Sequence, residues 1–139
     1  MLELNRPLRV LHVEDDPDAA RLFARWLAWF RAVTLDVVQV GDLKTALELL
    51  ERETFDALLL DLQLPDADES NTLGTASEIA RRLPVVILTG NDDADLANLA
   101  VQLGVKGYLP KAQQDGLSVG SAIVDAFEQH HWPRPVLGG

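Results

Sequence analysis

Two kinds of apolar pattern alternate along the chain, and this alternation restricts the possible folds more than any other feature. Five short, nearly continuous apolar runs are typical of strands that are buried on both faces: 8–13, 33–40, 55–62, 84–89 and 105–109. Five further segments carry apolar residues at helical spacing: 17–31, 42–52, 71–83, 92–103 and 115–130. Strands that alternate with helices predict an α/β fold, a doubly wound, five-stranded parallel sheet flanked by five helices.

Length and composition indicate one domain and exclude several functions. The 139 residues predict a single domain over 1–131, followed by a tail or linker over 132–139 that is rich in proline and glycine. The absence of cysteine excludes disulfides and a thiol nucleophile. A net charge of −10 opposes direct binding to nucleic acid. No apolar run approaches the roughly 20 residues that cross a bilayer, so we expect no membrane span and a cytoplasmic protein.

Polar residues stand where the predicted strands end. Glu14 and Asp15 follow the first strand, and Asp61 ends the third. Thr89 ends the fourth strand, and Lys111 follows the fifth. Ligands of such folds bind beyond the carboxyl ends of the strands. If the first, third, fourth and fifth strands lie side by side, these five side chains converge on one pocket.

The residue types in this pocket indicate metal-assisted phosphoryl chemistry. Three carboxylates packed together repel one another unless a cation or a proton intervenes. Oxygen ligands without histidine or cysteine favour a hard divalent ion, Mg²⁺ (or Mn²⁺). A carboxylate beside such an ion and a lysine is equipped to attack a phosphoryl group. The ammonium group offsets the charge on the transferring oxygens, and a threonine hydroxyl can bind one of them.

Four segments in chain order carry a resemblance to a known family. They are 13–17 (VEDDP), 58–66 (LLLDLQLPD), 86–90 (VILTG) and 107–111 (GYLPK), each at a predicted strand end. Over about residues 8–130 the sequence resembles a response-regulator receiver domain of two-component signalling. The resemblance implies a flavodoxin-like sheet with strand order 2-1-3-4-5 and a phosphoprotein that works as a signalling switch in a phosphorelay. Such a domain catalyses only its own phosphorylation and dephosphorylation.

The resemblance also implies a role for individual residues. Asp61 would be the phosphoacceptor, converted to an aspartyl phosphate. Glu14 and Asp15 would hold Mg²⁺ together with Asp61 and the backbone carbonyl of Gln63. Thr89 and Lys111 would bind the phosphoryl oxygens.

Further implied roles concern switching and partners. Tyr108 would move inward as Thr89 shifts, and Gln63, Gly90 and Asn91 occupy positions that tune the lifetime of the phosphoryl group. The implied phosphodonor is a histidine kinase or a histidine phosphotransfer protein. Output would pass through the surface formed by the fourth helix, the fifth strand and the fifth helix, where a homodimer is also possible.

Two positions depart from the family pattern. Ala112 stands where the family often has proline after the lysine, so we expect an altered loop after Lys111. Glu69 stands where the family tends to have glycine. With Asp66 and Asp68 it places three acids near the expected site. These acids predict slower phosphorylation or a narrower choice of phosphodonors. They also predict a short or irregular third helix.

Other residues have structural interpretations. Asp16 precedes Pro17 at a predicted helix start, where it suits a capping role. His12 lies inside an apolar strand and is interpreted as a packed core histidine. Trp29 and the neighbouring aromatic residues of the first helix are interpreted as core or as an interface.

Two alternative functions remain open at this point. One is a receiver-like scaffold that binds partners without phosphorylation, which the substitutions at Glu69 and Ala112 leave possible. The other is a phosphatase-type enzyme with a strand-end aspartate nucleophile. That enzyme requires a second aspartate two residues further on, where Gln63 cannot act as a general acid.

Overall fold

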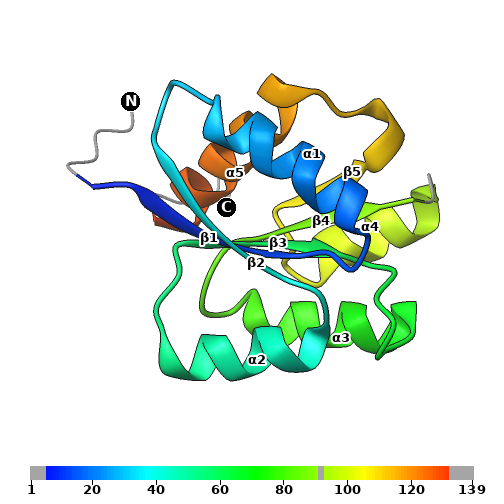
Figure 1. Cartoon of the computed structure of the whole chain (residues 1–139). Coiled ribbons are helices and arrows are strands. Elements are labelled where there is room, and N and C mark those ends of the chain that lie inside the picture. Colours follow the sequence, from blue (N-terminus) through cyan, green and yellow to red (C-terminus); the bar gives the residue numbers. More distant parts are fainter. Residues whose placement is uncertain (1–5, 91–92, 132–139) are drawn as a thin grey trace, which may run out of the picture.

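The computed structural model describes residues 6–90 and 93–131 and shows a sheet covered by helices on both faces (Figure 1). Helices α1 and α5 pack on one face, and α2, α3 and α4 pack on the other. The strands are β1 (Leu8–Val13), β2 (Leu35–Val40), β3 (Ala57–Asp61), β4 (Val85–Thr89) and β5 (Gly107–Pro110). The helices are α1 (Pro17–Ala28), α2 (Leu43–Arg52), α3 (Glu69–Ile79), α4 (Ala94–Gln102), the 3₁₀ turn η1 (Lys111–Gln113) and α5 (Gly116–His131).

All strand pairs are parallel, and the sheet order is β2-β1-β3-β4-β5. The predicted α/β fold and strand order are therefore confirmed. The pairing of Val13 with Leu60 places the residues that follow β1 beside the end of β3. Asp61 pairs with Leu88, so Thr89 lies one residue beyond it on β4. This order brings four strand ends together at one edge of the sheet.

Strands β1, β3 and β4 are buried because they pack apolar side chains against helices on both faces. One cluster joins Leu11, Leu58 and Leu60 to α2, α3 and α4. The opposite cluster joins Val10 and Leu59 to α1 and α5. The described segments contain no helix that combines the length and the apolar character needed to cross a membrane.

His12 belongs to the interior on the α1 side of the sheet. Its side chain is completely buried, and its ring meets the ring of Phe23 edge to face at 5.8 Å between centroids. The interpretation of His12 as a packed core histidine is therefore confirmed.

Aspartates begin five of the helices. Each accepts a hydrogen bond from a backbone N–H in the first turn that follows, which satisfies donors that the helix itself leaves open; they are Asp16, Asp42, Asp68, Asp93 and Asp115. The predicted capping role of Asp16 is confirmed. Helix α3 begins at Glu69, two residues earlier than predicted, and runs for 11 residues. The expectation of a short or irregular third helix is wrong, because Asp68 caps it.

The acids that follow Asp61 are engaged in helix starts. Both carboxylate oxygens of Asp66 accept backbone N–H groups of α2, from Leu43 and Lys44 at 3.0 Å each. Asp68 accepts the N–H of Asn71 at 2.7 Å. These contacts give Asp66 and Asp68 a structural role, and their expected effect on phosphodonors stays a prediction.

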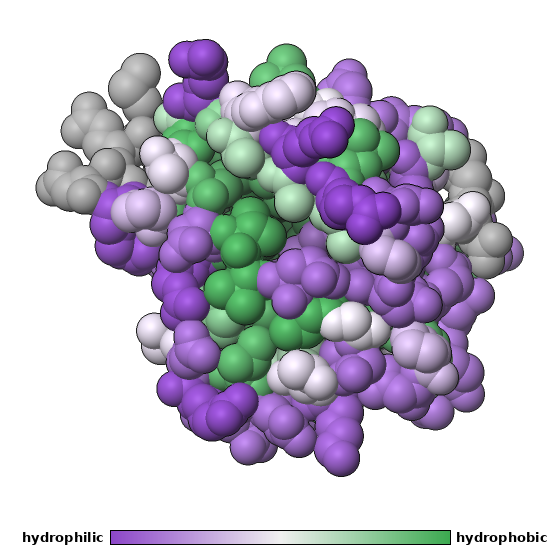
Figure 2. Space-filling view, in the orientation of Figure 1, coloured by the Kyte–Doolittle hydropathy of each residue, from purple (hydrophilic) through white to green (hydrophobic). Residues whose placement is uncertain are grey.

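Strand β2 forms one edge of the sheet, and its side chains are only partly covered. Val37, Val38 and Val40 are half-buried, while Asp36 and Gln39 are exposed. Figure 2 shows apolar surface along this edge, between α1 above and α2 below, with hydrophilic side chains on both sides. Asp36 pairs with Arg9 across the edge at 3.7 Å, and such charges discourage pairing with another strand.

Two glycines of α5 lie against aromatic side chains of α1 and of the segment that follows it. An added Cβ at Gly120 would lie 2.3 Å from Cδ1 of Phe30, and one at Gly116 would lie 3.1 Å from Cδ1 of Trp26. Trp26 and Phe30 are accordingly half-buried, whereas Trp29 is 72% exposed. Of the two interpretations given for these aromatic residues, core or interface, Trp26 and Phe30 fit the core, and the exposed Trp29 leaves the interface as a prediction.

Gly120→Ala is expected to lower the free energy of unfolding by about 1–3 kcal/mol, because the added methyl group overlaps the Phe30 ring and forces a shift. Gly74→Ala is the matched control: it lies inside α3 with nothing within 4 Å of the added Cβ, and should raise stability by about 0.5–1 kcal/mol. Urea unfolding of both variants checks this. Equal gains in stability at the two positions would show that α5 can move away from Phe30 without loss of folding free energy.

Candidate functional site

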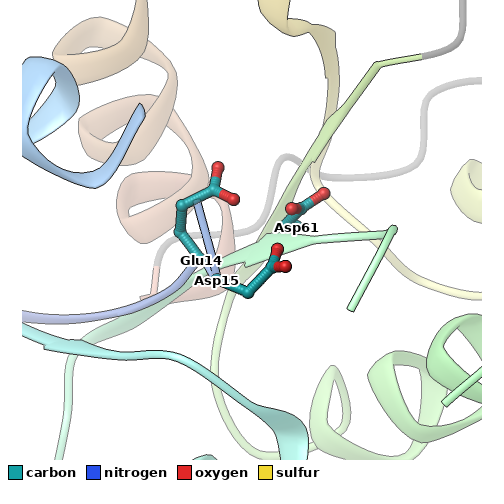
Figure 3. Close-up of side chains that lie close together, drawn as sticks. All are labelled: Glu14, Asp15 and Asp61. Atoms are coloured by element: carbon teal, nitrogen blue, oxygen red, sulfur yellow. The ribbon is translucent and has the colours of Figure 1, made fainter. Parts of the chain in front are cut away.

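Three carboxylates converge where β1 and β3 end (Figure 3). Oxygen atoms of Glu14, Asp15 and Asp61 all lie within 4.8 Å of one another. Glu14 and Asp61 are each 1% exposed, whereas Asp15 faces solvent. The cluster thus has a buried base and an open side.

The backbone around Glu14 explains why its side chain lies at the carboxyl ends of the strands. Its N–H bonds to the carbonyl of Val40 at 2.9 Å, which continues the pairing of β1 with β2 by one residue. Its carbonyl accepts the side-chain amide of Gln39 at 2.6 Å. One carboxylate oxygen, Oε2, then accepts the backbone N–H of Asp16 at 3.2 Å, next to the start of α1.

Lys111 brings a positive charge to this acid cluster. Its Nζ lies 2.5 Å from Oε1 of Glu14 and 3.1 Å from Oδ2 of Asp61. The other oxygen of Asp61, Oδ1, accepts the backbone N–H of Gln63 at 3.0 Å. One lysine therefore bridges two buried carboxylates that come from different strands.

The loop after β5 positions this lysine. Lys111, Ala112 and Gln113 form the 3₁₀ turn η1 directly after Pro110. The side-chain amide of Gln114 closes the turn on the carbonyl of Pro110 at 3.0 Å. Ala112 therefore occupies a compact turn that needs no proline at that position.

Burial and neighbouring charges have opposing effects on the pKa values of Glu14 and Lys111. Burial, together with the hydrogen bond to Asp61, raises the pKa of the Glu14 carboxyl, and Lys111 opposes that rise. Burial disfavours the charged form of Lys111, but its hydrogen bond to Glu14 and the charge of Asp61 outweigh burial and raise its pKa. Lys111 is thus charged at neutral pH and compensates the buried acids.

Gln63 joins the ends of β3 and β4 through its side chain. Its Nε2 donates to the hydroxyl oxygen of Thr89 at 3.0 Å, and its Oε1 accepts the backbone N–H of Gly90 at 2.9 Å. Thr89 is fully buried at the end of β4. From the sequence, only the backbone carbonyl of Gln63 and a tuning role were expected. The side-chain bridge depends on the register between two strands. The residues next to Gln63 in the sequence therefore do not predict it.

Two other predicted residues lie apart from this cluster or outside the described ranges. Tyr108 pairs with Ile87 on β4 and packs against the core on the α2 side, where its hydroxyl oxygen is buried. Its side chain is therefore directed inward. Asn91, predicted as a tuning residue, lies outside the described residues.

The acid cluster is chemically suited to a divalent cation. All three side chains offer oxygen, and the exposed Asp15 leaves one side open to an ion with bound waters. The cluster could therefore hold a metal ion. Around it stand an ammonium group, a hydroxyl group and a backbone N–H, which are the groups that bind an anion transferred to a carboxylate.

Comparison with known proteins gives a consistent result. A family model described as the response regulator receiver domain matches residues 10–119, most of the chain. The regulatory protein LuxO of Vibrio cholerae is 31% identical over 114 residues, which cover 80% of this chain and 24% of LuxO. The chain thus spans about a quarter of the length of that relative.

Solved structures agree with the sequence comparison. A sensor protein from Polaromonas sp. JS666 superposes with a TM-score of 0.76 at 29% identity, covering 90% of this chain and 98% of that one. The Mn²⁺-bound form of the response regulator Rcp1 superposes with a TM-score of 0.66 at 25% identity, covering 96% and 100%. The overall fold therefore agrees with the folds of these two structures.

Proposed function

The chain belongs to the response regulator receiver domain family, and from that premise we propose that Asp61 accepts a phosphoryl group with the help of a divalent cation. The observation that supports this best is the pairing of buried Asp61 with Lys111 at 3.1 Å, inside a cluster of three carboxylates. Receiver domains in general are signalling switches rather than enzymes.

The proposed transfer assigns a task to each group. The phosphorus–nitrogen bond of a phosphohistidine breaks, and a phosphorus–oxygen bond forms to the Asp61 carboxylate. The departing imidazole nitrogen keeps the electron pair and takes up a proton. Lys111 then neutralises a phosphoryl oxygen, and the hydroxyl of Thr89 and the N–H of Gly90 supply hydrogen bonds.

We assign the cation site to Glu14, Asp15 and Asp61, with the backbone carbonyl of Gln63 as a further ligand. Oxygen ligands on a partly open cluster suit Mg²⁺, and the similar Rcp1 structure binds Mn²⁺. When bound, the ion would offset negative charge between the carboxylates and an incoming phosphoryl group. Lys111 alone carries one charge against three, which is the physical reason for requiring the ion.

The proposed partners follow from the family. The phosphodonor is a histidine kinase or a histidine phosphotransfer protein. Output is assigned to the surface of α4, β5 and α5, where Leu99 and Val101 are 42% and 62% exposed; a homodimer through this surface belongs to the same proposal. The net charge of −10 makes direct contact with nucleic acid unfavourable. The cytoplasmic location stays a prediction.

Incubation with acetyl phosphate and Mg²⁺, followed by intact mass measurement, tests the proposal. We expect the wild type to gain the mass of one phosphoryl group, and a chelator to prevent the gain. Asp61→Asn should gain nothing, because an amide cannot form the acyl phosphate. Asp125→Asn, an exposed position on α5, is the matched control and should behave as the wild type.

The same experiment separates the alternatives. No mass gain on the wild type would favour the phosphorylation-independent scaffold, and an equal gain on Asp61→Asn would place the modification elsewhere. A phosphatase-type enzyme would instead release inorganic phosphate with many turnovers. Gln63 opposes that reading, because both ends of its amide are committed to hydrogen bonds at β4.

A further inference from the structure

The side chain of Gln63 occupies the edge of the site with a matched pair of hydrogen bonds. A backbone N–H can only donate, so the contact with Gly90 at 2.9 Å must involve the amide oxygen. The amide nitrogen then faces the hydroxyl oxygen of Thr89 at 3.0 Å. The orientation of the amide is therefore determined by Gly90, because exchanging the two ends of the amide would set its nitrogen against the backbone N–H, donor against donor.

These two partners are the groups that an anion on Asp61 would need. Asp61 pairs with Leu88 across the sheet, so Thr89 and Gly90 are the next residues along β4. The amide oxygen of Gln63 takes up the N–H of Gly90, as a phosphoryl oxygen would. The amide nitrogen donates to the oxygen of Thr89 at 3.0 Å, so a shift of this oxygen away from Gln63 toward Asp61 would stretch or break the bond.

We propose that Gln63 is a positioning residue that acts as a latch: its amide holds Thr89 and Gly90 in the unphosphorylated arrangement, and a phosphoryl group on Asp61 must displace it. This inference rests on the proposed function of Asp61. The latch adds a cost to phosphorylation that a receiver with an apolar residue at this position would not have. Gln63 therefore sets the balance between the two states of the switch as well as the lifetime of the phosphoryl group.

The latch can first be tested without any phosphoryl group. Amide hydrogen exchange at Gly90, followed by NMR on the unphosphorylated protein, should be about tenfold faster in Gln63→Leu than in the wild type, because the N–H loses its acceptor. Gln63→Asn keeps an amide but is one methylene shorter, so it should also exchange faster. Gln129→Leu, at an exposed position on α5, is the control. Unchanged exchange in both Gln63 variants would overturn the latch.

The second test uses beryllofluoride with Mg²⁺ as a mimic of the phosphoryl group. We expect Gln63→Leu to bind it about tenfold more tightly than the wild type, since no latch has to open. The Thr89 and Gly90 resonances of the free variant should lie closer to their beryllofluoride-bound positions. Equal binding would exclude the latch, and weaker binding would exclude it and mean that Gln63 assists the bound anion.

The two tests separate the latch from the proposed function beneath it. If the wild type binds no beryllofluoride and gains no phosphoryl group, the proposed function fails, and the latch as a regulator fails with it. If instead the wild type is phosphorylated normally and the Gln63 substitutions change neither the Gly90 exchange rate nor the beryllofluoride affinity, only the latch fails.

Discussion

Lys111→Met is expected to lower the free energy of unfolding by about 3–5 kcal/mol at neutral pH without divalent ions. The lysine Nζ lies 2.5 Å from Glu14 and 3.1 Å from Asp61, and both carboxylates are almost completely buried. Methionine fills a similar volume but leaves the two acids facing each other without compensation. The loss should be smaller at low pH, where one of the acids takes up a proton.

Urea unfolding in the presence of a chelator measures this effect. Lys106→Met removes a charge of the same kind from an exposed position, and should change stability by less than about 0.5 kcal/mol. Addition of Mg²⁺ should stabilise Lys111→Met more than the wild type, because the ion replaces the missing charge in the cluster. Equal losses for the two lysine variants would show that the buried acids do not need Lys111.

His12→Leu is expected to make the protein more resistant to acid. Burial lowers the pKa of His12 from 6.5 to about 4, with Lys111 adding to the effect and Glu14 opposing it. Between these pH values the unfolded chain binds a proton on His12 and the folded chain does not. Stability present above pH 6.5 is therefore lost as the pH falls toward 4, by about 3 kcal/mol for this group alone.

Unfolding curves from pH 7 to pH 4 check the prediction. The difference in unfolding free energy between His12→Leu and the wild type should widen steadily toward low pH, whatever the other groups contribute to both proteins. At pH 7 the variant should be at least as stable, because neither ring nitrogen of His12 has a hydrogen-bond partner among the described residues. Parallel pH profiles would show that His12 becomes charged inside the folded protein.

The fold could be predicted because its signals are local and repeated. Buried strands such as Leu8–Val13 are apolar throughout, and a capping acid such as Asp16 or Asp42 precedes the helix it starts. The observed helix boundaries differ from the predicted ones where residues that favour a helix stand beside residues that disfavour one. Gly74 and other small residues weaken the pattern of α3, so its start was predicted too late, although Asp68 caps it.

The convergence of Glu14, Asp15, Asp61 and Lys111 could be anticipated from the predicted strand ends, together with the strand order that the family resemblance implies. The hydrogen bonds that complete the site could not. The Gln63 bridge requires the register of β3 against β4, and the contact of Asp66 with α2 joins residues 23 positions apart. Nothing in the neighbouring sequence distinguishes such an aspartate from an exposed one.

The sheet order also has a consequence for how the chain assembles. Glu14 directly follows β1, and Asp61 ends the adjacent strand β3, so they meet as soon as β1 and β3 pair. Lys111 follows β5, the edge strand formed from the last part of the sheet sequence. During synthesis from the N-terminus the two acids therefore emerge long before their lysine. Until β5 docks, the half-built sheet holds uncompensated charge, and a divalent cation in solution should speed its formation.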